Sequence, residues 1–264
     1  MRVLIVGDVH GQHQKLAEVL REAQADFRIG AAIQVGDFGF YKDMIGRLRE
    51  EELRFPVPLH VIDGNHEDHQ WLRGVLLTGA GRAWKKELNL IYQPRPSMTQ
   101  FGTSKVGFLG GALHVDRPQK HNLLSGFPNY ILRRHREHAV SLFNQQRPEL
   151  IVTHSCPSGI GIGIQSSANM EPGVVEHITA AGFDAGPQDD CGELELGRLW
   201  LELAYKPRAW VFGHFHRAHE SSIEGTLFVC VSDALDSPFR TLVIWDTEEK
   251  KLLRCPADPS AELR

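Results

Sequence analysis

Short apolar runs recur along the chain, and each one ends in glycine or a polar residue. They are rich in valine and isoleucine and lie at residues 2–7, 31–36, 58–63, 105–111, 149–154, 208–214, 226–232 and 240–246. Near-continuous apolar runs of this length are typical of strands that are buried on both faces. The pattern therefore predicts β-sheets whose two faces are both covered.

Helical periodicity fills several of the intervals between these runs. Residues 12–24 place apolar side chains at i, i+3, i+4 and i+7, and residues 193–204 repeat that spacing. Asp190 and Glu193 resemble a capping box at the start of the second of these helices. A third helix is expected over 131–145, with basic residues near its start.

Strands that alternate with helices indicate an α/β fold with helices outside the sheet. The strands that follow residue 205 come with few helices, which predicts a second sheet or an antiparallel extension. Residues 112–130 are polar and contain two prolines, so we expect a loop and helix insertion around 112–148. The chain is interpreted as a single domain over 1–264.

Composition narrows the functional classes. Of the 264 residues, 42% are apolar and 23% are charged, and the net charge is −4 with a pI near 6.4. This balance argues against a protein that grips nucleic acid by bulk positive charge, although nucleic acid stays possible as a substrate. No apolar run approaches the roughly 20 residues of a membrane span. The five-residue apolar run in "MRVLIVGDVHG" is too short for a signal peptide.

The cysteines show no C-x-x-C spacing, so we expect reduced thiols and a cytoplasmic protein. They are Cys156, Cys191, Cys230 and Cys255.

Polar residues with metal-binding chemistry follow five of the predicted strands. In chain order they are Asp8 and His10, Asp37, Asn65 and His66, His154, and then His214 and His216. Ligands of α/β sheets gather beyond the carboxyl ends of the strands, so these side chains are expected at one edge. Glycine precedes four of them, which would let the backbones converge closely.

Each of these residues alone has an ordinary explanation as a helix cap or turn former. Turn chemistry gives no reason, however, for histidine to recur directly after four strands. Imidazole together with carboxylate suits divalent cations such as Mn, Fe, Zn, Ni or Co. Two such ions about 3.5–4 Å apart stabilise an in-line displacement at phosphorus. The set therefore favours two divalent metal ions, with Mn expected.

The segments "GDVHG", "GDFGF", "GNHE", "VTH" and "GHFH", in this order, resemble the motif series of the calcineurin-like metallophosphoesterase superfamily. The resemblance implies a four-layer α/β/β/α sandwich of two mixed β-sheets flanked by helices. It also implies a phosphoesterase that uses a metal-bridging hydroxide. The first metal would be bound by Asp8, His10 and His216, the second by Asn65, His154 and His214, and Asp37 would bridge both. His66 would assist the leaving group.

The serine/threonine protein phosphatase branch is disfavoured by the residues after Asp37. That branch has a valine–aspartate–arginine–glycine run there, whereas this chain has Phe38, Gly39, Phe40 and Tyr41. The arginine that precedes "GNHE" in that branch is replaced by Asp63. Because an arginine clamp suits a dianionic monoester, its loss favours a phosphodiester over a phosphomonoester. A nuclease and a non-catalytic binding protein on the same fold remain alternatives.

Substrate contacts are harder to identify. Phe38, Phe40 and Tyr41 could stack on a base or an aryl group, or could pack in the core. His114 and Arg117 follow a strand, and Arg117 could meet a phosphate, although a solvated loop is the favoured explanation. The remaining histidines, His13 and His69 among them, are expected on the surface.

Overall fold

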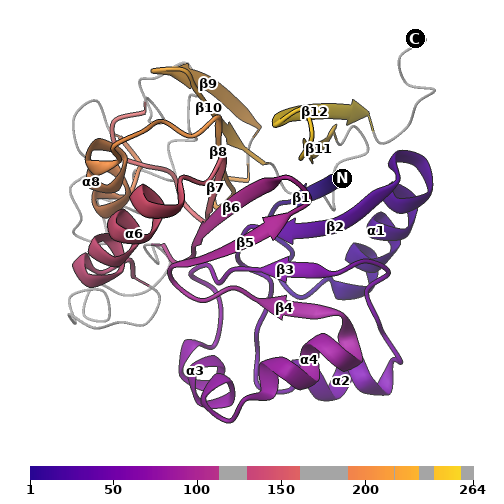
Figure 1. The fold of residues 1–264 in the computed structure, drawn as a ribbon. Helices are drawn as coiled ribbons and strands as arrows, with labels where there is room; N and C mark the ends of the chain where they lie inside the picture. The colour runs from indigo at the N-terminus through magenta and orange to yellow at the C-terminus, as the bar shows by residue number, and fades with distance from the viewer. Residues whose placement is uncertain (113–129, 161–189, 217, 232–240, 257–264) are drawn as a thin grey trace.

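The computed structural model describes residues 1–112, 130–160, 190–216, 218–231 and 241–256 (Figure 1). Its strands are β1 (Arg2–Val6), β2 (Ile29–Gln34), β3 (Leu59–Val61), β4 (Leu90–Tyr92), β5 (Ser97–Phe101), β6 (Ser104–Leu109), β7 (Leu150–Thr153), β8 (Ala209–Phe212), β9 (His219–Ile223), β10 (Thr226–Cys230), β11 (Thr241–Asp246) and β12 (Lys251–Pro256). Its helices are α1 (His13–Phe27), α2 (Met44–Glu50), α3 (His69–Leu77), α4 (Ala80–Leu88), α6 (Arg133–Gln146) and α8 (Leu194–Glu202).

The described strands form two mixed sheets of six strands each. The first has the order β12-β11-β1-β2-β3-β4, in which β1 to β4 are parallel and β11 and β12 are antiparallel additions at one edge. The second has the order β5-β6-β7-β8-β10-β9, with a parallel centre and an antiparallel strand at each end. The sequence predicted that the strands after residue 205 form a second sheet or an antiparallel extension, and both occur. β9 and β10 belong to the second sheet, and β11 and β12 extend the first sheet in antiparallel order.

Strand alternation distributes apolar side chains between the layers. In β1, Leu4 packs toward the helices while Ile5 packs toward the second sheet, and in β8 Trp210 and Val211 divide in the same way. This follows from the period of two along a strand, which sends successive side chains to opposite faces. Each sheet is therefore covered on both faces, as the continuous apolar runs predicted.

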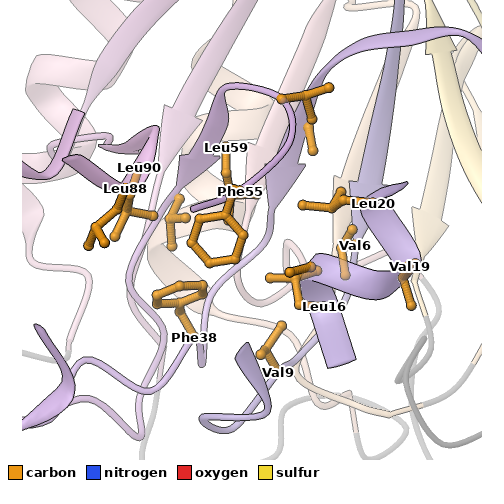
Figure 2. Close-up of a cluster of buried hydrophobic side chains, with 14 of the residues drawn as sticks. Val6, Val9, Leu16, Val19, Leu20, Phe38, Phe55, Leu59, Leu88 and Leu90 are labelled. Carbon is orange, nitrogen blue, oxygen red and sulfur yellow. The ribbon is translucent and has the colours of Figure 1, made fainter. Parts of the chain in front are cut away.

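Helices cover the outer face of each sheet. α1 to α4 pack on the first sheet through a cluster that includes Leu16, Phe38 and Phe55 (Figure 2), and α6 and α8 pack on the second through Phe143 and Trp200. Burying one such leucine or phenylalanine side chain stabilises the fold by about 1.5–3 kcal/mol. The four-layer α/β/β/α sandwich is thereby confirmed.

The start of α8 differs from the expected capping box. The helix begins after Glu193, whose side chain makes no capping hydrogen bond. The Asp190 carboxylate instead accepts hydrogen bonds from the Ser158 hydroxyl and from the backbone N–H groups of Gly159 and Gly192. Asp190 therefore fastens two loops together rather than the helix end. None of the helices in the described part of the chain has the length and apolarity of a membrane span.

Candidate metal centre

Five strands of the two sheets end at one place and deliver the polar residues that the motifs singled out. β1, β2 and β3 of the first sheet lead to Asp8, Asp37 and Asn65, and β7 and β8 of the second lead to His154 and His214. Two groups of side chains result, and in each group the candidate ligand atoms all lie within 4.8 Å of one another. They are Asp8, His10 and His216, and Asp37, His154 and His214.

The first group is open to solvent on one side. Nε2 of His216 lies 3.0 Å from Oδ2 of Asp8 and 3.3 Å from Nε2 of His10. The Asp8 side chain is 2% exposed, whereas those of His10 and His216 are 31% and 48% exposed. The carboxylate thus forms the floor of the group and the two imidazoles form its rim.

The second group lies deeper. His154 is fully buried, and its Nδ1 donates to the carbonyl oxygen of Val35 at 2.8 Å. That bond leaves Nε2 as the nitrogen turned toward Asp37 Oδ2, at 3.3 Å, and toward Asn65 Oδ1, at 3.0 Å. Asn65 therefore joins this group through its amide oxygen. A backbone acceptor on the far nitrogen is the arrangement that orients a metal-ligating histidine.

His214 and His216 belong to different groups, but strand alternation is not the reason. β8 ends at Phe212, and the two histidines adopt left-handed backbone conformations with φ of 70° and 51°. His10 and Asp37 share this feature, with φ of 46° and 54°. Non-glycine residues rarely adopt this region, and such conformations concentrate at functional sites. The sharp turn after the strand, rather than an extended backbone, separates the two imidazoles.

Two glycines allow the loops to close on the centre. A Cβ on Gly64 would lie 2.2 Å from Asp37 Oδ1, and one on Gly213 would lie 2.4 Å from Asp8 Oδ1. Any side chain at these positions would displace a carboxylate. The glycines that precede the polar residues therefore serve the close approach that the sequence indicated.

The electrostatics of the donor set fit divalent cations. Asp8 and Asp37 are each 1% exposed, and within the described residues their ion-pair partners are all histidines. Burial works to raise the pKa of Asp37, but His154 and His66 hold it well below its usual range. Burial works to lower the pKa of His154, but Asp37 and Asp8 raise it to about 10. Two buried carboxylates surrounded by imidazoles form a negative site that a metal ion would neutralise.

His66 lies beside the exposed rim. Its ring centroid is 5.2 Å from that of His10, in an edge-to-face arrangement, and its backbone N–H donates to Asp37 Oδ1 at 2.8 Å. Tyr41 is 38% exposed, and its ring lies near the loop that carries His10, because a Cβ on Gly11 or Gly39 would be 3.9 or 3.3 Å from its Cε2. Of the three substrate candidates that the structure describes, Phe38, Phe40 and Tyr41, only Tyr41 is exposed.

The other substrate candidates have different outcomes. Phe38 is fully buried and packs against Phe40 and Phe55, so its ring is unavailable to a substrate and that prediction is wrong. Phe40 is equally buried. His114 and Arg117 lie outside the described residues.

The surface expectation for the remaining histidines also fails at two positions. His13 is 5% exposed and His69 is 6% exposed. The ring of His13 packs against Phe38 in the core beside the centre, at a centroid distance of 4.5 Å.

Glu67 is a supporting residue that the motif contains but the sequence did not explain. Its carboxylate accepts hydrogen bonds from the backbone N–H groups of Phe38, at 2.8 Å, and Gly64, at 2.9 Å. It therefore ties the loop after β2 to the loop after β3. Burial, with Asp37 and Asp63 nearby, raises its pKa well above the usual range. A glutamate within "GNHE", between two loops that both carry ligands, was the available signal.

Asp63 also has a partner that sequence order conceals. The Arg95 guanidinium donates to both Asp63 carboxylate oxygens, and both side chains are at most 6% exposed. Arg95 therefore lies beside Asp63, the residue that precedes Gly64, but its guanidinium is ion-paired with the Asp63 carboxylate.

Comparison with known proteins places this geometry in a family. The family model described as calcineurin-like phosphoesterase matches residues 1–218. No match was found among curated proteins. Among solved structures, TT1561 of Thermus thermophilus aligns with a TM-score of 0.55 and 13% identity, over 97% of this chain and 99% of that one. A putative 5'-nucleotidase from Staphylococcus aureus in complex with alpha-ketoglutarate aligns with a TM-score of 0.54 and 14% identity, over 98% of this chain and 55% of that one. At these identities the structures show the shared fold, and the match over residues 1–218 shows that the chain belongs to the calcineurin-like phosphoesterase family.

Proposed function

We propose that the protein is a dinuclear metal-dependent phosphoesterase that hydrolyses a phosphodiester or a phosphomonoester. The observation that carries the proposal is the pairing of two ligand groups at one edge, each with a buried carboxylate and two imidazoles. The groups are adjacent, because the backbone N–H of His214 in one donates to Asp8 Oδ1 in the other at 3.1 Å. Asp37 is assigned as the residue shared by both ions.

Each ligand residue has a defined task in this scheme. Asp8, His10 and His216 would hold one ion, while Asn65, His154 and His214 would hold the other. When bound, two divalent ions would lower the pKa of a coordinated water and stabilise negative charge on the phosphoryl oxygens. We assign Mn²⁺ as one of the ions that support activity.

His66 is assigned to the leaving group. It lies at the open rim, where a phosphoester can reach it, and it is outside both ligand groups. A histidine in this position can donate a proton to the departing oxygen, a role worth typically 10²–10⁴-fold in rate. The half-exposed Tyr41 ring provides a surface at the same rim for the body of the substrate.

We further propose a preference for diesters. Arg95, which lies beside the residue before Gly64, is ion-paired with Asp63 and so does not provide a free clamp for a dianionic phosphate. A singly charged diester needs less positive charge from the protein.

A phosphoester panel tests the proposal. The purified protein is stripped of metal, reloaded separately with Mn²⁺, Fe²⁺, Zn²⁺, Ni²⁺ or Co²⁺, and offered bis-p-nitrophenyl phosphate, p-nitrophenyl phosphate, cyclic nucleotides, single-stranded DNA and phosphopeptides. We expect metal-dependent hydrolysis with a higher kcat/KM for the bis ester. A strong monoester preference would refute the diester assignment, and absence of hydrolysis with every ion would refute the proposed function.

A further inference from the structure

A second concave site lies next to the metal centre. An open cavity of about 400 Å³ is lined by α3, by the chain that follows β4 and by the start of α6. Ligand pockets commonly measure about 300–1,000 Å³, so this cavity has the size that takes a small organic molecule. In Figure 1, α3 and α6 lie on the same side of the molecule as the arrowhead of β4.

The strand order places the cavity beside the candidate catalytic centre. β3 and β4 are parallel neighbours, so their carboxyl ends lie at the same sheet edge. The segment after β3 brings Asp63 to the cavity and, two residues later, Asn65 to the metal centre. The segment after β4 brings Arg95 to the cavity, where it bonds Asp63 at 2.9 Å. The cavity and the metal centre therefore share the segment that follows β3.

The cavity combines apolar walls with unbalanced positive charge. Leu72 and Leu76 of α3, Tyr92 and Leu132 supply apolar surface. Arg95 is neutralised by Asp63 at the floor.

Two further arginines stand at the cavity, Arg73 on α3 and Arg134 on α6. Both are exposed, and no carboxylate of the described residues forms an ion pair with either. Two arginines from two helices thus line the cavity, and neither is ion-paired with a carboxylate of the described residues.

His135 contributes a neutral imidazole to the cavity lining. Its Nδ1 accepts a hydrogen bond from the backbone N–H of Leu132 at 3.2 Å, so the ring proton lies on Nε2. Burial and then the charges of Arg95 and Arg134 lower its pKa to about 4. The imidazole is therefore neutral at pH 7, and it offers a hydrogen-bond donor rather than a further charge.

We propose that this cavity binds an apolar group carrying a carboxylate or phosphate, as the part of the phosphoester substrate that lies beyond the scissile phosphorus. The inference rests on the proposed function and narrows it, because it predicts substrates with a second anionic group. Arg73 and Arg134 bind the anion, since guanidinium groups pair bidentately with carboxylate and phosphate. The leucines and Tyr92 accept the apolar body.

The kinetic test uses diesters that share one leaving group. Phenyl p-nitrophenyl phosphate is compared with its 3-carboxyphenyl and 4-carboxyphenyl analogues, all of which release p-nitrophenolate. We expect the wild-type protein to favour at least one carboxylated diester by about tenfold in kcat/KM. In Arg73→Glu/Arg134→Glu this ratio should fall to about one or below, and Arg73→Lys/Arg134→Lys should recover part of it.

A matched control carries the same change of charge elsewhere. Arg21→Glu/Arg82→Glu alters two exposed arginines of α1 and α4 that do not line the cavity, and it should keep the wild-type ratio. The proposal would be overturned if the wild type showed no preference for a carboxylated diester. It would also be overturned if Arg73→Glu/Arg134→Glu and Arg21→Glu/Arg82→Glu showed the same ratio of kcat/KM values.

A binding measurement separates this inference from the proposed function. The metal-free protein is titrated with 8-anilinonaphthalene-1-sulfonate, an aromatic anion whose fluorescence rises in apolar sites. We expect Arg73→Glu/Arg134→Glu to weaken binding by about tenfold or more and the control variant to leave it unchanged. Equal binding by both variants would show that the cavity is not an anion site. If no phosphoester is hydrolysed with any ion, the proposed function is refuted, whatever the dye titration shows. If the dye binds but the enzyme shows no preference for carboxylated diesters, the role of the cavity in substrate binding is refuted.

Discussion

The backbone N–H of His66 donates a 2.8 Å hydrogen bond to Oδ1 of Asp37, and the N–H of Asn65 donates to the same oxygen at 2.8 Å. The other oxygen, Oδ2, faces His154 Nε2 at 3.3 Å. One carboxylate thus orients a candidate ligand and the candidate acid through the backbone, while its second oxygen faces the second ligand group. The position of His66 is consequently linked to the residue assigned to both ions.

Replacing Asp37 by asparagine should remove activity and loosen both metals. The amide lacks the negative charge, and if its oxygen accepts the two backbone hydrogen bonds at the Oδ1 position, its NH₂ group replaces Oδ2 and cannot bind a metal ion. We expect kcat/KM to fall by at least about 10²–10³-fold, the scale for removal of one electrostatic group, and the metal content measured by mass spectrometry to drop. Asp43→Asn, which changes an exposed aspartate on the following connection, should match the wild type. Near-normal turnover in Asp37→Asn would contradict the shared role.

His66→Asn should separate chemistry from metal binding. Because His66 is outside both ligand groups, the variant should retain its metal while kcat falls by roughly 10²–10⁴-fold. The exposed His138 provides the control substitution, and His138→Asn should leave kcat unchanged. Loss of metal from His66→Asn would show that His66 is a ligand.

Gly64→Ala should damage the centre although it adds one methyl group. The new Cβ would lie 2.2 Å from Asp37 Oδ1 and 2.7 Å from His154 Nε2, so both side chains would have to move. We expect reduced metal content and a loss of activity of about 10²-fold, the scale of a misplacement of about 1 Å. Gly46→Ala is the matched control, because a Cβ there meets nothing within 4 Å and the residue is exposed in α2. That change should leave activity intact and stabilise the protein by about 0.5–1 kcal/mol.

Removal of metal should abolish activity reversibly. Dialysis against a strong chelator should reduce hydrolysis of bis-p-nitrophenyl phosphate to background, and Mn²⁺ should be among the ions that restore it. Metal content and rate are measured on the same samples. Full activity in a protein free of metal would refute metal-dependent catalysis.

Stability should fall with pH below about 6.5 because of His60, a buried histidine outside the centre. Burial, assisted by Lys85, lowers its pKa to about 4, and its Nδ1 accepts a 2.7 Å hydrogen bond from Gln93. The unfolded chain, with a pKa near 6.5, binds a proton that the folded chain does not, so stability is complete above that pH and is lost below it. Between about pH 7.5 and pH 5 this loss is about 2 kcal/mol.

The asparagine variant isolates this contribution. His60→Asn keeps an acceptor near Nδ1 but cannot titrate, so its free energy of unfolding in urea should change less between the two pH values than that of the wild type. The exposed His138→Asn should follow the wild-type curve. Identical pH dependence of His60→Asn and the wild type would exclude His60 as the source.

The layered fold was predictable because its signals are local. Apolar runs report strands that are buried on both faces, and the polar residues after them report which strand ends meet. α3 and α4 were missed because Gly74, Gly79 and Gly81 interrupt the apolar periodicity of that stretch, and Asp68 capping Trp71 leaves a weak signal. β9 was missed because its "HESSI" sequence is polar, and its pairing with β10 defines it.

The support of the site could not be read from neighbouring residues. Phe38 follows a candidate ligand and is aromatic, but its ring packs against Phe55, a partner that sequence order does not reveal. Glu67 and the Asp63–Arg95 pair depend on contacts between loops that are 29 or more residues apart. Side chains that hold ligands in place are identified by what they touch, and those contacts exist in the folded chain alone.

Each ligand group draws on both sheets, and this has a mechanical consequence. Asp8 and His10 follow a strand of the first sheet, while His216 follows a strand of the second. His10 and His216 are 206 positions apart in the sequence. An ion bound by either group is therefore a removable cross-link between the two halves of the sandwich, and it closes one of the longest loops in the chain. Cross-links of long loops restrict the unfolded ensemble the most. The exchange of backbone amide hydrogens in β1 and in β8 should consequently slow together when metal is added, because one bound ion would link the two sheets.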